Sequence, residues 1–206
     1  MKTVQNILLG LIAFSLLAGC GGLSRKAVEK RYYTLDVKRE RVEGKPFSGK
    51  VLKIRRMRIS PLYDGRELVY KLGGERMESD FYNLFFMPPV ELLSHDLGRW
   101  MDASDVFSGT VSPASLADAD YTLEGVVNVL YGDFSNGRKV AVVEMQFFLL
   151  DERKADNHIV FSRNYAERTP ITDNSPTAVV RGMREGVRNI FMQLENDLRE
   201  QVASGI

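Results

Sequence analysis

The sequence predicts an α/β (α+β) fold: one mixed, largely antiparallel sheet of about five to six strands, packed against two amphipathic helices. Three observations predict it. Short segments with alternating or continuous apolar residues, typical of strands, recur along the chain. The segments 88–101 and 175–198 instead repeat apolar residues every three or four positions, as helices with one buried face do. The 206 residues are enough for one domain with a sizeable core.

The first residues have the pattern of a secretory signal. Residues 1–6 are polar with one positive charge, at Lys2, and residues 7–18 are almost wholly apolar, ending in the small residues Ala18 and Gly19. The apolar run of about 12 residues is short of the about 20 that a membrane-spanning helix needs. We therefore predict a cleaved signal peptide over residues 1–19.

Cys20 is the only cysteine in the chain. An intrachain disulfide is thereby excluded, and a catalytic thiol would need a histidine beside it, whereas His95 and His158 lie far along the chain. The four residues Leu17–Cys20 resemble the lipobox of bacterial lipoproteins. The alternative is a plain signal peptide with an incidental cysteine.

The lipobox resemblance implies that Cys20 carries a diacylglyceryl group and, after cleavage, an acylated amino group. Two or three acyl chains anchor a protein stably where one does not. The mature chain would then start outside the cytoplasm, in the periplasm. Gly21, in place of the aspartate that retains some lipoproteins in the inner membrane, favours by resemblance the periplasmic face of the outer membrane.

Three regions follow: the signal peptide, a lipidated N-terminus and tether over 20–30, and a single periplasmic domain over 31–206. A polar tether of ten residues, 21–30, reaches about 33–36 Å when fully extended. The formal net charge of +1 argues against a nucleic-acid partner.

The first half of the domain predicts three strands. Residues 31–37 are rich in strand formers, and a charged loop follows. Residues 51–59 alternate, but their apolar phase slips between Ile54 and Met57, which predicts a bulge or a twist. A turn over 60–65 leads to a strand over 67–72.

A helix is predicted from Pro88, because the following apolar residues fall on one face. These residues are Val90, Leu93, Leu97, Trp100 and Met101. Residues 102–118 predict a loop or a short strand around Val106 and Phe107.

Three strands and a helix complete the domain. Residues 121–131 predict a strand with Tyr121, Leu123, Val127, Val129 and Tyr131 on one face. Residues 140–150 are apolar on both faces, which predicts a central strand, and residues 159–165 pair back as a third. Ser175 is the predicted N-cap of the last helix, with Pro176 at its first position. Its apolar stripe, which includes Val187 and Ile190, predicts a core face rather than a partner groove.

The common catalytic and metal-binding motifs are absent from the sequence. Asp118 and Asp120 read as turn acids, and neither histidine has a partner at fixed local spacing. Glu144, within an apolar strand, should face solvent or pair with a basic residue across the sheet. We expect no enzymatic activity, no metal and no cofactor.

The order of lipobox, tether, strands and helices resembles the ABC-type transport auxiliary lipoprotein family, the PqiC-like proteins that accompany MCE-domain lipid transporters. Two stretches carry the resemblance: Tyr33-Thr34-Leu35, and the turn Pro61–Arg66, which is similar to the family's P-x-Y-L-D-R. The following "LVYK" stands in place of "IVYR". The stretch "NLFFMPP" departs from the pattern, because the family has a tryptophan and a basic residue there.

The resemblance implies a non-enzymatic accessory protein that docks an MCE protein and its permease components at the outer membrane. Aromatic residues are enriched at binding hot spots, although each could equally belong to the core. The candidate partner-binding residues are Tyr63, Asp64, Arg66, Tyr70, Phe85 and Phe86. Arg66, with Tyr63 beside it, should contribute to the contact with the MCE protein or to the loop that shapes this contact. The alternative is that Asp64 and Arg66 merely satisfy the turn.

Two other functions fit the same sequence. A lipid or glycolipid carrier would hold an acyl chain, such as that of a phospholipid, between the helices and the sheet. An outer-membrane assembly factor would resemble the small lipoproteins that accompany barrel proteins.

Overall fold

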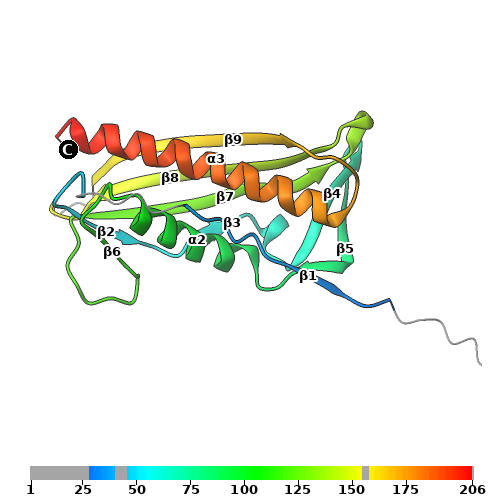
Figure 1. Ribbon diagram of the computed structural model, residues 1–206, viewed down its shortest axis with the longest axis horizontal. Coiled ribbons are helices and arrows are strands. Elements are labelled where there is room, and N and C mark those ends of the chain that lie inside the picture. The colour runs from blue at the N-terminus through cyan, green and yellow to red at the C-terminus, as the bar shows by residue number, and fades with distance from the viewer. Residues whose placement is uncertain (1–27, 40–45, 155–157, 206) are drawn as a thin grey trace, which may run out of the picture.

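The computed structural model describes residues 28–39, 46–154 and 158–205. The predicted signal peptide, the lipobox with Cys20 and most of the tether lie outside these described residues. A mixed nine-stranded sheet packs against two helices, α2 and α3, which lie together over one of its faces (Figure 1). The predicted α+β fold with one mixed sheet is thus confirmed, with more strands than the five or six expected. No helix in the described part of the chain is long and apolar enough to cross a membrane.

The sheet is organised around β7 (Tyr121–Asp133). On one side it starts an antiparallel meander with β8 (Val140–Asp151) and β9 (His158–Pro170), which confirms β8 as a central strand. On its other side three short strands pair with it in parallel, one after another along its length. They are β2 (Val51–Ile54), β3 (Arg58–Ile59) and β4 (Glu67–Gly73).

The predicted bulge in 51–59 is a complete break between β2 and β3. Met57, within the break, is buried at 1% exposure, and its backbone N–H donates to Ser94 Oγ of α2 at 2.9 Å rather than to a strand. The slip in the apolar phase therefore marks the point where the chain leaves β7 to contact α2, and pairing with β7 resumes at the next residue, Arg58.

Two strands in the first half of the domain, β5 (Arg76–Phe85) and β1 (Arg31–Tyr33), differ from prediction. β5 pairs antiparallel with β4 and was not expected, because its first half is charged and exposed. β1, which pairs in parallel with the end of β5, is shorter than the predicted 31–37. Beyond β1 the chain leaves the sheet. Asp36 has a φ of 46°, and the residues on either side of it, Leu35 and Val37, are buried in the core.

Two details of the middle segment are also corrections. The short strand β6 is Gly109–Val111, paired with β2, whereas Val106 and Phe107 are core residues outside any strand. A bulge at Val127–Val129 shifts the face of β7, so that Leu130 is buried, whereas Val129 and Tyr131 are only partly buried. The predicted single apolar face of this strand therefore ends at Val127.

The two helices follow their predicted faces. α2 spans Pro89–Ala103, and all five residues of its predicted stripe are buried. α3 spans Pro176–Ala203, and its N-cap Ser175 accepts from the Ala178 backbone N–H at 3.2 Å. Val187 and Ile190 are fully buried, which confirms the core face.

Close packing of α3 on the sheet depends on a glycine. A Cβ added at Gly182 would lie 2.6 Å from Ile171 Cγ2 and 2.8 Å from the Ala141 Cβ of β8. Carbon atoms in contact stay about 3.5–4.0 Å apart. Gly182 therefore sets how near α3 can approach β8.

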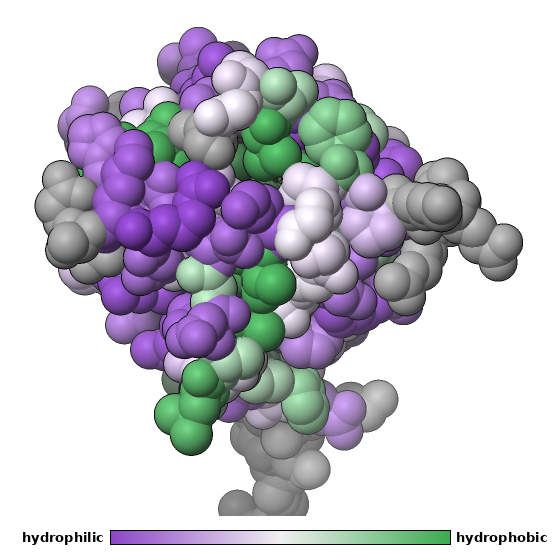
Figure 2. All heavy atoms as spheres, turned by 90° about the vertical axis from the view of Figure 1, so that its left-hand side faces the viewer, coloured by the Kyte–Doolittle hydropathy of each residue, from purple (hydrophilic) through white to green (hydrophobic). Residues whose placement is uncertain are grey.

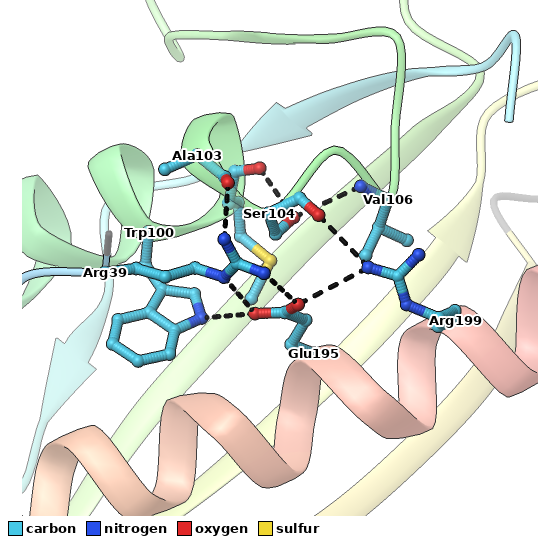
Figure 3. A network of polar contacts seen from close by, with 8 residues as sticks. Arg39, Trp100, Ala103, Ser104, Val106, Glu195 and Arg199 are labelled. Atoms are coloured by element: carbon cyan, nitrogen blue, oxygen red, sulfur yellow. Dashed lines mark hydrogen bonds and ion pairs between the residues drawn. The ribbon is translucent and has the colours of Figure 1, made fainter. Parts of the chain in front are cut away.

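A buried carboxylate joins α2, α3 and the N-terminal segment (Figure 3). Glu195, at 6% exposure, accepts from Arg39 Nε at 2.7 Å and Nη2 at 2.9 Å, and from Trp100 Nε1 at 3.1 Å. Arg199 lies at 3.4 Å and also donates to the Ser104 carbonyl at 3.1 Å. Arg39 further donates to the Ala103 carbonyl at 2.8 Å. The chain just after the tether is thus fixed to the last turn of α2.

Candidate functional site

The turn singled out by sequence, Pro61–Arg66, connects β3 to β4. Pro61–Tyr63 is a short 3-10 helix, and Ser60 before it donates its N–H to the Val127 carbonyl at 2.9 Å. The Tyr63 ring is buried and stacks on Tyr131, with centroids 6.3 Å apart. Burial, followed by the proximity of Tyr131, raises the pKa of Tyr63. The side chain of Tyr63 therefore belongs to the core and forms no part of the exposed surface.

Two other candidates have structural contacts. Phe85 is 2% exposed and lies in the core. Tyr70 is partly buried against Phe134, and its hydroxyl donates to Asp80 Oδ2 at 3.0 Å. Burial and then the Asp80 carboxylate raise the pKa of Tyr70, so its hydroxyl stays protonated and keeps donating. For Phe85, the structure therefore supports the alternative that the ring belongs to the core.

Arg66 and Phe86 are brought together, around a residue that the sequence reasoning missed. Arg66 Nε donates to the Phe85 carbonyl at 3.0 Å, and its guanidinium carbon lies 5.3 Å from the centroid of the Tyr32 ring. Phe86 meets the same ring edge-on at 6.3 Å. Tyr32 is 52% exposed and Phe86 is 65% exposed. The alternation in "RYY" could have identified Tyr32, because it turns away from the partly buried Tyr33.

A second exposed aromatic pair lies in β5. Leu68 of β4 pairs with Asp80, whereas the preceding Glu67 pairs with Leu84, so residues 81–83 bulge out of the ladder. Asp80 holds this bulge, accepting from the backbone N–H groups of Tyr82 at 2.9 Å and Asn83 at 3.0 Å. Phe81 and Tyr82 consequently point outward, edge to face at 5.2 Å.

We name Tyr32, Phe81, Tyr82 and Phe86 the aromatic end. Lys30 links the pair Phe81 and Tyr82 to the N-terminal segment that carries Tyr32. Its Nζ lies 4.2 Å from the Phe81 ring centroid, and Lys30 precedes Tyr32 by two residues. The neighbouring turn is exposed at Leu62, which is 74% exposed, and at Asp64, and also at Pro61 and Gly65. The structure therefore groups three of the six candidate residues, Asp64, Arg66 and Phe86, at the end of the domain where the described chain begins.

An open groove of about 530 Å³ lies between α2 and the β2–β6 edge. Ile54, Val111 and Gly98 line its apolar part, and three arginines surround it. Each arginine faces an acid: Arg55 pairs with Glu124, Arg56 with Glu91 and Arg99 with Asp36. The groove therefore offers apolar surface with a largely neutralised rim.

The remaining polar residues have ordinary surroundings. Glu144 lies 3.6 Å from Arg168 across the sheet, which confirms the predicted cross-strand pairing. His95 is exposed, with Nδ1 3.5 Å from Asp96 Oδ1, and His158 is also exposed. Among the described residues, no group of three or more histidine, aspartate or glutamate side chains is placed to hold a metal ion.

Comparison with known proteins identifies the fold. No protein-family model matches the chain, and no curated protein matches it. A solved structure from Xanthomonas campestris, assigned to the family DUF330, superposes with a TM-score of 0.73 over 84% of this chain and 98% of that one, at 15% identity. The chain shares its fold with that DUF330 protein.

Two further structures extend this likeness. An uncharacterized protein superposes with a TM-score of 0.65 at 15% identity, covering 82% of this chain and 99% of its own. A hypothetical protein from Chlamydia trachomatis gives 0.55 at 9% identity, covering 77% and 100%. At such identities the likeness concerns the fold alone.

Proposed function

We propose that the protein is an outer-membrane-anchored periplasmic lipoprotein that serves, without enzymatic activity, as an accessory component of an MCE/ABC-type lipid-transport system. One observation carries the proposal: the exposed turn and the aromatic end lie where the described chain begins. Val28 is eight residues beyond Cys20 (28 − 20), and eight residues span at most about 26–29 Å. A surface at this end is therefore held close to the membrane that receives the lipid.

This confinement gives the domain a physical role. A short tether raises the effective concentration of the domain for any assembly that reaches the same membrane. The resemblance of the turn and of the first strand to the PqiC-like family names that assembly as an MCE protein with its permease. The fold shared with a DUF330 protein is compatible with this family.

Within the turn, Leu62 and Asp64 are exposed side chains that a partner can reach. Leu62 is a large apolar side chain that is 74% exposed, within a short 3-10 helix whose preceding residue, Ser60, is hydrogen-bonded to β7. An exposed apolar side chain on a fixed backbone can support a contact, because burying it against a partner removes apolar surface from water. We therefore place the partner contact at Leu62 and Asp64, with Arg66 shaping the loop behind them.

The anchor is tested by Cys20→Ser, which should abolish acylation and stable membrane fractionation. The docking is tested in the wild-type background by a photocrosslinking residue at Leu62, with the same residue at Leu116, which is fully exposed, as the matched control. We expect capture of an MCE protein from position 62 and not from position 116. Palmitate incorporation that persists in Cys20→Ser refutes the anchor, whereas equal capture, or none, from both positions refutes the docking site.

A lipid carrier is a second candidate, because the groove between α2 and β6 has apolar walls. No atom lies within 4 Å of a Cβ added at Gly98, so a larger side chain there would fill the groove without a clash. If the groove binds an acyl chain, Gly98→Leu should lose co-purifying phospholipid that Gly98→Ala retains. Equal lipid content in the wild type and both variants refutes the carrier.

A further inference from the structure

The aromatic end exposes several large apolar side chains that lie close together. Its two tyrosines and two phenylalanines are between 42% and 65% exposed, and Met87 beside Phe86 is 45% exposed. Grouped exposed apolar residues on a folded domain mark an interaction surface, whereas single ones do not. The opposite end of the molecule, which carries the end of α3, is mostly hydrophilic, with its hydrophobic residues in small separate groups (Figure 2).

The aromatic rings are paired with cations. Lys30 lies over Phe81 and Arg66 over Tyr32, at 4.2 and 5.3 Å from the ring centroids. Aromatic rings concentrate at the headgroup level of a bilayer, where an apolar body and a polar partner are both accommodated. Cations at the same level meet lipid phosphates. Rings and cations held together in this way match the chemistry of a phospholipid interface.

The charges at this end do not favour an anionic partner in particular. Lys30, Arg31 and Arg66 are accompanied by four acids of the same region, which are Glu29, Asp64, Glu67 and Asp80. Asp80 is already engaged by Tyr70, Tyr82 and Asn83. With positive and negative groups nearly balanced, association should depend on the aromatic rings, and zwitterionic lipid should suffice.

The position of the tether selects the bilayer as the partner. Lys30, which rests on the Phe81 ring, is ten residues from Cys20 (30 − 20), so the ring lies at most about 33–36 Å along the chain from the acylated residue. A shorter path of the tether brings the aromatic end closer to the acylated residue, because the tether joins the domain at this end. The chain enters the domain through this surface rather than beside it.

We propose that the aromatic end lies in the headgroup region of the phospholipid bilayer to which the protein is anchored, with Tyr32, Phe81 and Phe86 as the inserted side chains. The proposal rests on the lipid anchor proposed above. It adds a second contact to the acyl chains, and so fixes the orientation of the domain: the end that carries the C-terminus of α3 points away from the membrane, and Leu62 is held at the membrane's edge.

The test uses the full lipidated protein in phosphatidylcholine vesicles. Because the chain has one cysteine and that residue is acylated, Phe81→Cys and Phe86→Cys each accept a single fluorophore, with Leu116→Cys as the control at the other end. Quenching by spin-labelled lipid is compared with quenching by aqueous iodide. We expect lipid quenching at positions 81 and 86 to exceed that at 116 at least about twofold, with the order reversed for iodide.

A second variant guards against an effect of the label itself. Phe81→Ser combined with Phe86→Ser, labelled at Leu62→Cys, should lose the lipid quenching that the same label shows with both phenylalanines present, at unchanged far-UV circular dichroism. Labels at 81 and 86 that remain open to iodide on vesicle-bound protein overturn the proposal while leaving the anchor intact. Shielding that requires an added MCE protein overturns it in favour of a protein contact. Protein that is not acylated by mass and does not float with vesicles refutes the anchor as well.

Discussion

Removing the Glu195 carboxylate should destabilise the domain far more than removing any surface acid of α3. In the folded protein this side chain accepts two hydrogen bonds from Arg39 and one from Trp100, in a setting where Glu195 is 6% exposed. Breaking a buried ion pair from one side costs about 3–5 kcal/mol, because the remaining charge is left without its partner. Arg39 keeps its bond to the Ala103 carbonyl and its side chain is 17% exposed, so we expect Glu195→Ala to fall at the low end, about 3 kcal/mol.

The measurement is urea unfolding followed by the fluorescence of Trp100, the only tryptophan in the chain, which itself donates to Glu195. Far-UV circular dichroism on the same samples separates a change of local emission from a change of stability. A lower midpoint at unchanged slope indicates lost stability rather than a different denatured state. Glu195→Gln keeps the shape and one acceptor oxygen, so it should cost less, about 1–3 kcal/mol.

Glu185→Ala is the matched control, because Glu185 lies on the same helix and faces Arg188 at 3.6 Å with both side chains about half exposed. Such surface pairs contribute about 0–1 kcal/mol. If Glu195→Ala and Glu185→Ala shift the midpoint equally, the buried network does not fix the N-terminal segment to the helices, and the reasoning from burial is wrong.

Three further outcomes follow from the packing and the charges. Val187→Ala and Ile190→Ala, each at a fully buried position, should cost roughly 2–4 kcal/mol by urea unfolding, and unchanged midpoints would show that α3 is not docked. Gly182→Ala should cost about 1–3 kcal/mol by the same assay, because its Cβ has no room against the sheet; a neutral effect would mean that α3 can move outward freely. The bidentate hydrogen bonds of Arg153 hold the pKa of Asp151 below its usual 3.8, so the stability it contributes is complete above that value and is lost as the pH falls through the lower folded pKa. Asp151→Asn should therefore flatten the acid limb of the stability–pH curve, and an identical acid limb in both proteins would contradict the assignment.

The elements that sequence predicted well are those whose apolar period is long and uninterrupted. The stripes of α2 and α3 and the two-faced apolar run of β8 each specify burial at many positions at once, so a few exceptions do not change the result. The phase slip before Met57 marks the right position, but it predicts a bulge or twist within one strand, whereas the structure has a break between two strands. Its cause, the hydrogen bond from Met57 to Ser94, lies 37 residues away and leaves no local signal.

The elements that sequence missed are those whose conformation depends on contacts with other segments rather than on their own apolar pattern. β5 is charged in its first half, and it forms because the β4 hairpin provides its hydrogen bonds. β1 ends after Tyr33 because Leu35 and Val37 are buried in the core and do not continue the strand. Arg184 of α3 donates to the Leu35 carbonyl there. In the candidate site, the outward position of Phe81 depends on Asp80 holding a bulge, and nothing in the local pattern distinguishes that phenylalanine from Phe85 in the core.

Arg66 illustrates how a family-like residue can matter without touching a partner. Its carbonyl accepts the Phe85 N–H at 2.6 Å and its side chain donates back to the Phe85 carbonyl, so one residue holds the end of β5 from two directions. The same guanidinium covers Tyr32 of β1. Loss of function in Arg66→Ala would thus follow from a loosened aromatic end as readily as from a lost contact. Leu62 is instead 74% exposed, and a defect in Leu62→Ser at unchanged stability would identify a surface that a partner recognises.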